Sequence, residues 1–566
     1  MNNEMKLKVK IVCNDPMKEE MVFIKNSKEK YVAAGMGEEH MSWEPSNPVL
    51  MTAQTGGGKN TYFEETILPY TKTKNVKVVI ISNRIANNRQ SKRRLAKIMG
   101  WHKNLEKLTP AGLDDVQSIG NVMILSYQKL CYIFENYDLL EIIKFFGKIG
   151  IVVFDEAHFF VSDSLFNSRT EYILQNCIKF FSKAIRIYMT ATPDEVFKEI
   201  INIEKQTCSN SYTVNCMADN MYAILKRRKI LIYNFKRNYK YIAATKYFET
   251  ADEIIKVISN DRTSQKWVVF VSSKTLGKEI CKQLGEIAVF IDASSKDSTE
   301  KDGVIYQELV EKEQFSCKAM VSTSVLDNGI NIKDSSLTNI VIFTYDKTEF
   351  IQMLGRKRIE EGENVTLYIC SRSSKAFNGK LNQVNQKISA ICAYKKDKQF
   401  FMKQYYEKSS ENFEIVRGIF YFDKNKLPCL NGFAERKLFN DKRFYEKMKD
   451  KFDNGVKEAF ILEQLTWVGL QKTYDERNWL NYNAALDQKA ELYRFLEKHT
   501  DITILDSNTE NFYKDFKVLY SRAFGKRVND RPDRNYGATV IRKIFTELSL
   551  NYDLKITNGS LTLVRI

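Results

Sequence analysis

The chain has 566 residues, of which 43% are hydrophobic and 12% aromatic, and this composition excludes an intrinsically disordered chain. Its 87 Lys and Arg outnumber its 70 Asp and Glu, and the net charge of +17 predicts a polyanionic partner, either nucleic acid or an anionic membrane surface. No apolar run approaches the roughly 18 residues of a membrane span, and no secretory signal is visible at the N-terminus. The length predicts three or four domains.

The ten Cys and four His are dispersed along the chain, and no C-x-x-C pair occurs. Zinc sites need clustered thiolate or imidazole ligands, so this pattern argues against a Cys/His metal centre. It predicts buried, reduced thiols in a cytosolic protein.

Short runs rich in Val and Ile, separated mostly by helical or mixed polar segments, predict strands buried on both faces of parallel sheets. There are nine such runs: Val76–Ser82, Val122–Ser126, Ile151–Phe154, Ile185–Met189, Trp267–Val271, Ala288–Ile291, Ala319–Ser322, Ile340–Phe343 and Val365–Cys370. One group ends near Pro193 and the other begins near Trp267, so the pattern predicts two α/β sheets of the doubly wound type. The stretch between them is expected to form a linker, a hairpin or strand, and then a helix.

The segment AQTGGGKNT follows the apolar run PVLMT and predicts a phosphate-binding loop between a strand and a helix. Glycines let backbone N–H groups approach phosphates, and the following Lys reaches the β and γ oxygens. The expected nucleotide-binding residues are Thr55, Gly56, Gly57, Gly58, Lys59, Asn60 and Thr61. Asn60 stands where Ser or Thr usually ligates Mg²⁺, and its amide oxygen is also a ligand for a hard cation.

The segment IVVFDEAHFF places Asp155 and Glu156 at the end of an apolar run. A carboxylate at this end of a strand holds Mg²⁺ through water, while its neighbour polarises the attacking water. We therefore expect Asn60 and Asp155 at a magnesium site.

Taken together, these segments resemble the motifs of superfamily 2 helicases of the DEAD/DEAH type, over about residues 45–372. The matching segments, in chain order, are AQTGGGKN (motif I), SNRIANNRQ (Ia), LSYQKL (Ib/Ic), Asp155-Glu156-Ala157-His158 (II), Thr190-Ala191-Thr192 (III), WVVFVSSK (IV), STSVLDNGINI (V) and QMLGRKR (VI).

The resemblance implies two tandem RecA-like domains, at residues 45–215 and 216–372, that sandwich ATP, with residues 1–44 as an N-terminal extension. It implies catalytic roles for Lys59, Asp155, Glu156, Gln352, Arg356 and Arg358. It implies coupling roles for His158, Thr190, Thr192 and Gly329, and nucleic-acid contacts for Arg84, Tyr127 and Thr323.

Two departures from the family pattern limit these expectations. Motif VI usually reads Q-x-x-G-R-x-x-R, whereas here the eighth position is Ile359 and the second Arg comes one place early, at Arg358. Arg356 is accordingly expected to be the principal arginine finger. In addition, no Gln precedes Gln54, so the Q motif that reads adenine is absent and base selectivity is left open.

From Ser371 on, 36 Lys and Arg stand against 25 Asp and Glu, so most of the net charge lies in the tail. Residues 373–510 are expected to form a helical accessory region, for which the sequence predicts no function. Residues 511–566 have the pattern helix, basic loop, helix and β-hairpin around Asn558-Gly559, which predicts a basic domain resembling a winged helix. Its expected phosphate contacts are Lys526, Arg527, Arg531, Arg534 and Arg542, together with Arg522 and Lys543.

The sequence thus predicts a cytoplasmic helicase or translocase that uses ATP and Mg²⁺ and binds nucleic acid, DNA in preference to RNA, and no membrane. Two alternatives stay open. One is an RNA helicase; the other is a nucleic-acid-binding scaffold with a decayed ATPase, which Asn60 and the shifted Arg358 suggest.

Overall fold

The computed structural model describes residues 8–11, 21–83, 85–101, 110–215, 229–323, 330–408, 410–524, 537–548, 550–557 and 559–566. The chain forms two compact units. The first comprises Met1–Thr245 and Ile255–Lys472, and the second comprises Lys246–Ile254 and Thr473–Ile566.

The first large sheet is parallel in its interior and antiparallel only at its two edges. Its strands, in spatial order, are β1 (Lys8–Ile11), β2 (Met21–Ser27), β9 (Lys229–Phe235), β3 (Pro48–Thr52), β8 (Ile185–Thr190), β7 (Ile149–Phe154), β4 (Lys77–Ser82), β6 (Val122–Ser126) and β5 (Ser118–Ile119). The strands from β2 to β6 pair in parallel, while β1 and β5 pair antiparallel. The phosphate-binding loop therefore follows a central strand.

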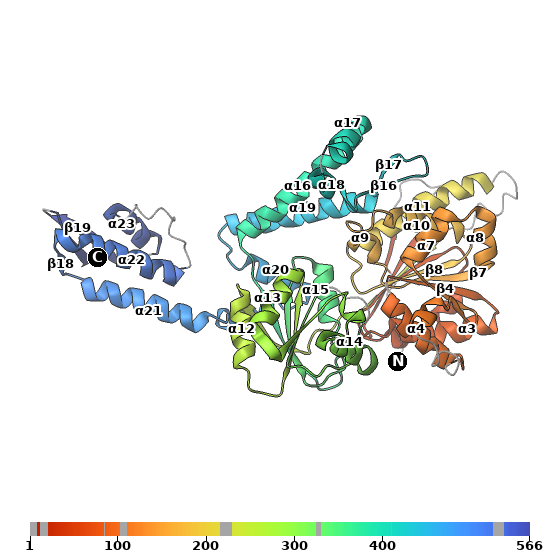
Figure 1. The fold of residues 1–566 in the computed structure, drawn as a ribbon, viewed down its shortest axis with the longest axis horizontal. Helices are drawn as coiled ribbons and strands as arrows, with labels where there is room; N and C mark the ends of the chain where they lie inside the picture. Colours follow the sequence, from red (N-terminus) through yellow and green to blue (C-terminus); the bar gives the residue numbers. More distant parts are fainter. Residues whose placement is uncertain are drawn as a thin grey trace. The chain divides into compact units, whose positions relative to one another are not determined.

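Helices cover both faces of this sheet (Figure 1). They are α1 (Val32–Met36), α2 (Lys59–Tyr62), α3 (Leu68–Thr73), α4 (Ile85–Ile98), α6 (Pro110–Asp115), α7 (Tyr127–Asn136), α8 (Leu139–Phe146), α9 (Phe159–Ser162), α10 (Thr170–Phe180) and α11 (Val196–Asn215). Alternate strand residues enter two separate cores: Leu50 and Ile81 lie in one, and Val49 and Ile80 in the other. This two-residue alternation explains why the strands read as unbroken apolar runs, since both faces are buried.

The second large sheet has the order β10 (Ile242–Phe248), β15 (Val365–Cys370), β14 (Leu337–Phe343), β11 (Lys266–Val271), β13 (Ala319–Ser322) and β12 (Ala288–Ile291). Strands β11 to β15 pair in parallel. The connecting helices are α12 (Ala251–Asn260), α13 (Lys274–Leu284), α14 (Lys301–Lys312) and α15 (Lys347–Leu354). All nine predicted strands are present, and the predicted architecture of two parallel α/β sheets is confirmed.

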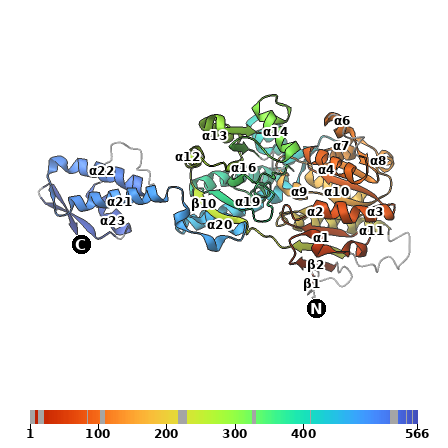
Figure 2. The same cartoon turned by 90° about the horizontal axis from the view of Figure 1, so that it is seen from below.

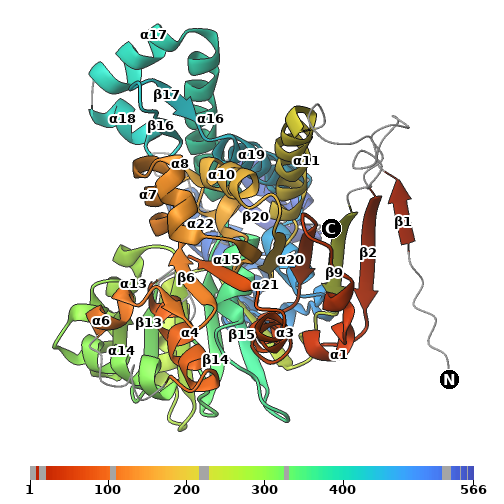
Figure 3. The same cartoon turned by 90° about the vertical axis from the view of Figure 1, so that its right-hand side faces the viewer.

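Two domain boundaries differ from those predicted, because strands near both ends of the first domain join its sheet. Strand β2 lies within the predicted N-terminal extension 1–44, and β9 lies within the predicted second domain 216–372. Figure 3 shows β1, β2 and β9 side by side at one edge of the sheet. Consecutive strands β9 and β10 thus belong to different sheets and form no hairpin, and the connection between the two domains falls at residues 236–241.

The accessory region that follows is helical, as predicted, with one small hairpin. It contains α16 (Ser374–Lys396), α17 (Lys398–Met402), a π-helical turn (Lys403–Glu407), α18 (Ser410–Val416), the hairpin β16 (Phe420–Phe422) and β17 (Pro428–Leu430), α19 (Gly432–Asp453) and α20 (Ala459–Trp467). Helices α16 and α19 pack along each other, and an aromatic group around Phe377 joins them to α20.

The second unit has the element order of a winged helix, but it begins earlier than predicted. It contains α21 (Tyr482–His499), β18 (Thr503–Ile504), α22 (Asp506–Phe524), α23 (Ala538–Glu547), β19 (Tyr552–Thr557) and β20 (Ser560–Arg565), with the sheet order β18-β20-β19. Figure 2 shows its three helices, α21, α22 and α23. Leu492 and Leu496 of α21 lie in the same core as Phe516 and Ile541. Helix α21 therefore belongs to this unit, and the predicted boundary at residue 511 falls too late. The predicted hairpin is confirmed by the pairing of Thr557 with Ser560.

In the described parts of the chain, none of the helices combines the length and the apolar character of a membrane span. Nor do those residues contain a group of three or more His, Cys, Asp or Glu side chains arranged to hold a metal ion.

A buried ion pair joins the sheet to α11. Arg186 of β8 is fully buried and donates from Nε and Nη2 to the Glu204 carboxylate, at 2.7 and 2.9 Å, while the Tyr188 hydroxyl donates to Glu204 Oε1 at 2.6 Å. Buried charges of this kind are tolerated only when they are paired and hydrogen-bonded.

We predict that Arg186→Met lowers the urea midpoint of unfolding, because it leaves the Glu204 carboxylate buried without its cation, a loss of about 3–5 kcal/mol. Arg417→Met is the matched control, since the Arg417–Glu414 pair is 69% and 61% exposed. That variant should shift stability by about 0.5 kcal/mol or less. Equal urea midpoints for the two variants would contradict a stabilising role for the buried Arg186–Glu204 pair.

Candidate active site

The loop after β3 has the backbone geometry of a phosphate cradle. Gly56 and Gly58 have positive φ angles of 81° and 77°, a conformation that residues with a Cβ adopt only with strain. A Cβ on Gly57 would lie 2.9 Å from the Gln54 carbonyl oxygen. Glycine is therefore required at these positions, and the loop leads directly into the helical segment that begins at Lys59.

Lys59 lies at the bottom of this cradle and is only 9% exposed. Its Nζ donates to the Ala53 carbonyl oxygen at 2.8 Å. Burial lowers the pKa of Lys59, and the nearby carboxylates of Glu156 and Asp155 oppose that shift. The loop thus holds a buried cation at the position where a phosphate anion is expected.

Asp155 and Glu156 lie at the carboxyl end of β7, where burial opposes the ionisation of both side chains. Desolvation, followed by the charge of Glu156, raises the pKa of Asp155, while Lys59 opposes the rise. For Glu156 burial also opposes ionisation, but a hydrogen bond and ion pair with His158, together with Lys59 and Arg356, lower its pKa. Glu156 also has a positive φ of 51°, so the turn that aims its side chain is strained.

His158 connects this acidic pair to the end of β8. Its Nδ1 lies 3.3 Å from Glu156 Oε2 and 3.4 Å from Thr190 Oγ1. Thr190 Oγ1 also accepts from the Thr192 backbone N–H at 3.0 Å. The structure therefore brings His158, Thr190 and Thr192 together in one hydrogen-bonded chain that starts at Glu156.

The residues expected from the second sheet follow α15. Gln352 is buried in that helix, and its Oε1 accepts from Arg356 Nη2 at 2.8 Å. After the helix ends at Leu354, Gly355 and Arg356 form a turn, and Lys357 forms a β-bridge with Ile332. Arg356 and Arg358 flank this bridge residue, while Lys357 Nζ donates to the Asp334 carbonyl oxygen and the Glu363 carboxylate.

Arg358, the arginine shifted by one place, is the one that reaches the phosphate cradle. Its Nη1 lies 3.2 Å from the position that a Cβ on Gly56 would take. Its Nε donates to Asn331 Oδ1 at 2.8 Å, and burial, then the charge of Arg356, lowers its pKa to about 10. The sequence favoured Arg356 as the principal finger, whereas Arg356 is 2% exposed and hydrogen-bonded to Gln352.

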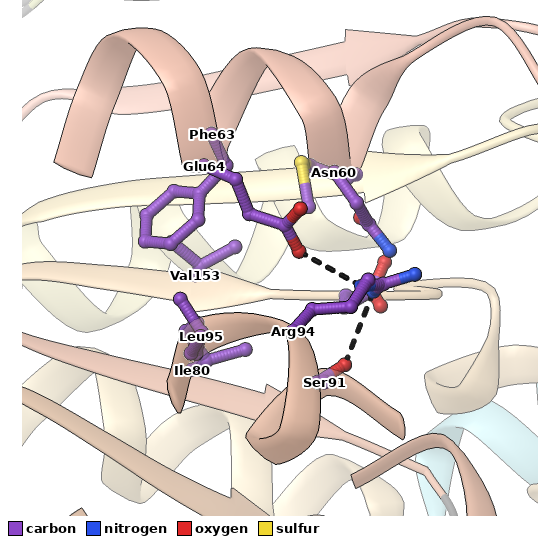
Figure 4. A pocket seen from close by; sticks show the side chains of 10 residues that line it. Asn60, Phe63, Glu64, Ile80, Ser91, Arg94, Leu95 and Val153 are labelled. Atoms are coloured by element: carbon purple, nitrogen blue, oxygen red, sulfur yellow. Dashed lines mark hydrogen bonds and ion pairs between the residues drawn. The ribbon is translucent and has the colours of Figure 1, made fainter. Parts of the chain in front are cut away.

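A small cavity of about 20 Å³ lies beside Asn60 and Asp155, between the segment after Lys59 and α4 (Figure 4). Arg94 Nε lies 3.1 Å from Glu64 Oε1, and Arg94 Nη2 donates to Ser91 Oγ at 3.4 Å. The Asn60 side chain points toward this guanidinium. The cavity has room for about one water molecule. Arg94 thus adds a positive charge near Asp155 that the sequence did not single out.

The residues around the cradle suit a nucleotide and a magnesium ion. Among the described side chains, Thr55 Oγ1 and Gln352 Nε2 are buried without a hydrogen-bond partner, and such atoms normally have one. Asn60 Oδ1 and the Asp155 carboxylate are hard oxygen donors of the kind that Mg²⁺ prefers. Thr61 lies exposed in the first turn of α2.

Two sequence-family models match the chain. "Type III restriction enzyme, res subunit" matches residues 17–195, and "Helicase conserved C-terminal domain" matches residues 246–359. Together they account for more than half of the chain and contain motifs I to VI in order. The chain belongs to the superfamily 2 helicases. It is therefore a nucleic-acid helicase of a nucleotide-hydrolysing family with two RecA-like domains.

Solved helicase structures resemble this helicase only distantly, and no curated protein matches it. S. cerevisiae Dbp5, bound to RNA and ADP BeF3, is 15% identical over 59% of this chain and 81% of its own, with a TM-score of 0.39. The Escherichia coli DEAH/RHA helicase HrpB is 13% identical over 61% of this chain and 43% of its own, with a TM-score of 0.39. Mycobacterium smegmatis Lhr, bound to ssDNA and AMP-PNP, is 11% identical over 73% and 60%, with a TM-score of 0.42.

One expected nucleic-acid contact of the helicase needs correction. Tyr127 is fully buried, stacks on Phe159 with ring centroids 4.2 Å apart, and donates its hydroxyl hydrogen to the Asp155 carbonyl oxygen at 3.1 Å. A side chain without exposed surface cannot grip a strand of nucleic acid. Tyr127 instead supports the backbone of the acidic pair from the core.

The other expected nucleic-acid residues are placed as follows. Thr323 lies 7% exposed directly after β13, and its backbone N–H donates to the Ile291 carbonyl oxygen. The Arg542 guanidinium binds Asp553 and the Leu554 carbonyl oxygen within its own unit. Arg522 lies in α22 and Lys543 in α23. The other predicted nucleic-acid contacts, and Gly329 with its predicted coupling role, lie outside the described residues: Arg84, Gly329, Lys526, Arg527, Arg531 and Arg534.

Gln54 makes a contact with the interdomain segment that the sequence did not predict. It is 8% exposed, and its Oε1 accepts from the Asn238 backbone N–H at 2.7 Å. Asn238 lies in the segment between the two RecA-like domains, so the phosphate loop of the helicase contacts the interdomain connection directly. Gln54 stands inside AQTGGGKN, but the position of residue 238 depends on the tertiary fold.

We predict that Gly355→Ala lowers the turnover of nucleotide hydrolysis, because its Cβ would lie 2.5 Å from Thr55 Cβ and hold the two RecA-like domains apart. Gly379→Ala is the control, since no described atom lies within 4 Å of its added Cβ. Turnover should fall about tenfold or more for Gly355→Ala, with a thermal midpoint close to that of the wild type. Equal turnover in both variants would show that the close contact between Gly355 and Thr55 has no role in catalysis.

Proposed function

We propose that this protein is an ATP-dependent helicase or translocase of the cytoplasm that acts on DNA in preference to RNA. The observation that supports it most is the meeting of charges from both sheets around one loop. Lys59, Asp155 and Glu156 come from the first sheet, and Arg356 and Arg358 act electrostatically on them from the second. Because the site needs both domains, hydrolysis is expected to depend on their relative movement.

Each residue has a role that fits its environment. Lys59 and the backbone of Gly56–Gly58 would bind the β and γ phosphates, and Asn60 and Asp155 would hold Mg²⁺. When bound, the nucleotide would supply the phosphoanhydride bond, and the metal ion would neutralise charge on the phosphates. Glu156, whose pKa is lowered, is ionised at neutral pH and suited to orient a water molecule. Arg358, and Arg356 beside it, would stabilise charge that develops during transfer.

The polyanionic partner is inferred from charge and from the second unit. The excess of basic residues after Ser371 lies mainly at residues 371–472, which contain 21 Lys and Arg against 12 Asp and Glu, whereas residues 473–566 contain 15 against 13. The second unit therefore supports the proposal through its winged-helix element order. In helix-turn-helix proteins the second helix of the pair enters the major groove, and α23 is the equivalent helix here. Because the equivalent helix in those proteins binds duplex DNA, we favour DNA over RNA as the substrate.

We predict that hydrolysis of ATP is stimulated by nucleic acid and that Lys59→Ala lowers turnover at least about 100-fold, because the cation at the phosphates is lost. Steady-state hydrolysis should be measured without polymer and with single-stranded DNA, duplex DNA or RNA. Lys74→Ala, an exposed lysine at the end of α3, is the control and should retain wild-type turnover.

The outcomes separate the three readings of the sequence. Stimulation by DNA above RNA supports the proposal, whereas stronger stimulation by RNA favours an RNA helicase. If turnover does not depend on Lys59 under any condition, the alternative that the protein is a nucleic-acid-binding scaffold is favoured. Repeating the assay with GTP, CTP and UTP tests base selectivity.

We also predict that Lys543→Ala, on the exposed side of α23, weakens DNA binding and reduces the slope of log affinity against log salt by about 1, because one phosphate contact is lost. The control is Lys449→Ala, an exposed lysine of α19 that pairs with Asp453. Fluorescence anisotropy of a labelled duplex at several salt concentrations measures both quantities. An unchanged slope for Lys543→Ala would remove α23 from the binding surface.

A further inference from the structure

Helix α19 of the accessory region begins on the first RecA-like domain. Asn431, which caps the helix, is fully buried, and its Nδ2 donates to the carbonyl oxygens of Ser164 and Asn167, both at 3.2 Å. The Gly432 backbone N–H donates to Glu171 Oε2 at 2.7 Å. Phe433 is part of the hydrophobic core of that domain. The start of α19 is therefore built into the first domain.

The rest of α19 belongs to a layer that packs on the second RecA-like domain. Lys447 and Lys451 of α19 pair with Glu463 of α20 at 3.0 and 2.9 Å. Gln464, from the same helix α20, donates to the Cys370 carbonyl oxygen at the end of β15 at 3.0 Å. Trp467 contacts Phe350 of α15, with ring centroids 5.3 Å apart. One helix of 22 residues thus connects the two domains that share the nucleotide site.

Lys437, one turn beyond this docked end, is the point at which both domains meet the helix. Its side chain is 8% exposed, and its Nζ lies 2.6 Å from Asp346 Oδ2, 3.5 Å from Glu195 Oε2 and 2.8 Å from Asp441 Oδ1. Asp346 belongs to the second domain, Glu195 to the first and Asp441 to α19 itself. A single ammonium group therefore links three segments that are far apart in sequence.

Both domain partners of Lys437 adjoin the machinery of the proposed function. Asp346 caps α15 by accepting from the backbone N–H groups of Thr348 and Glu349 at 2.7 and 3.0 Å, and α15 carries Gln352 and leads to Arg356 and Arg358. Glu195 follows Thr192 by three residues. A second ion pair, between Lys347 Nζ and Asp194 Oδ2 at 2.6 Å, joins the same two segments.

We propose that Lys437 is a positioning residue for hydrolysis: by binding Glu195 and Asp346 together, it sets helix α15, which leads to Arg356 and Arg358, against the end of motif III when the nucleotide site is assembled. This inference rests on the proposed function and gives a role to the accessory region, for which the sequence predicted none. The ion-pair partners of Lys437 are Glu195, Asp346 and Asp441, none of which is a residue assigned to the nucleotide, so its effect is expected in turnover and not in nucleotide affinity.

A cation facing three carboxylates in a buried position differs from a surface ion pair. Removing it leaves like charges close together with little water to screen them. The carboxylates then move apart, and with them the segments that bear Glu195 and Asp346. Lys447, on the same helix, also binds a carboxylate, but its partner Glu463 lies on α20 within the accessory region. Comparing variants of the two lysines therefore distinguishes an effect on interdomain positioning from an effect on helix stability.

The test compares Lys437→Met with Lys437→Arg and Lys447→Met in the full chain, using nucleic-acid-stimulated ATP hydrolysis. Lys437→Met should lower kcat about tenfold with little change in KM for ATP, a size usual for coupling residues. Lys437→Arg keeps the charge and should restore most of the turnover. Lys447→Met should retain the wild-type kcat.

Because Lys437→Met leaves buried carboxylates unbalanced and is at risk of misfolding, Glu195→Gln provides a second variant. The Glu195 side chain is 35% exposed, so the substitution should leave the fold intact while removing the first domain from the cluster. It should also lower kcat, whereas Asp441→Asn, which alters a partner within α19, should change kcat by about twofold or less. Thermal unfolding of each variant monitors folding.

The outcomes are distinguishable from failure of the proposed function. A wild-type chain without Lys59-dependent turnover overturns both proposals. An active wild type whose kcat is unaffected by Lys437→Met and Glu195→Gln overturns this inference and leaves the helicase proposal standing. Equal losses in Lys437→Met and Lys447→Met would assign Lys437 to stability alone, which also overturns it.

Discussion

The arrangement of the site depends on burying the Lys59 ammonium group beside two carboxylates at the carboxyl edge of a parallel sheet. Burial alone would drive this lysine toward its neutral form and Asp155 and Glu156 toward theirs. Their opposite charges limit these shifts, and His158 holds Glu156 ionised. The parallel topology makes this possible because β3 and β7 end at the same edge, with only β8 between them.

The second domain adds charge of the same sign as Lys59, which explains why the site is divided between domains. Arg356 and Arg358 approach a region that already contains a buried cation, and burial, followed by the charge of Arg356, lowers the pKa of Arg358. An arrangement with three cations near one loop is favourable when an anion with several charges lies among them. The charge pattern therefore suits a nucleotide polyphosphate, and the absence of one would favour separation of the domains.

The accessory region and the second unit use charge differently. In the accessory region, part of the positive charge is paired internally: Lys437, Lys447 and Lys451 pair with buried or half-buried carboxylates. In the second unit, Arg542 is also engaged within its own unit, whereas Lys543 lies exposed. The net charge of +17 thus overstates the surface available to nucleic acid, since part of it holds the helices together.

The two parallel sheets, the phosphate loop and the acidic pair could all be predicted from the amino-acid sequence. Local pattern suffices for these features: strands buried on both faces read as apolar runs, and a phosphate loop needs glycines next to a lysine. It could not assign β9 to the first sheet, because that strand joins β2 and β3 across about 200 residues of chain, a pairing that no local pattern encodes. Nor could it show that Tyr127 is buried under Asp155 or that Arg358 reaches Gly56. Which charges face one another depends on the tertiary structure, because burial and distance set their energies, and Lys437 binds Glu195 and Asp346 only after two domains and a helix have packed together.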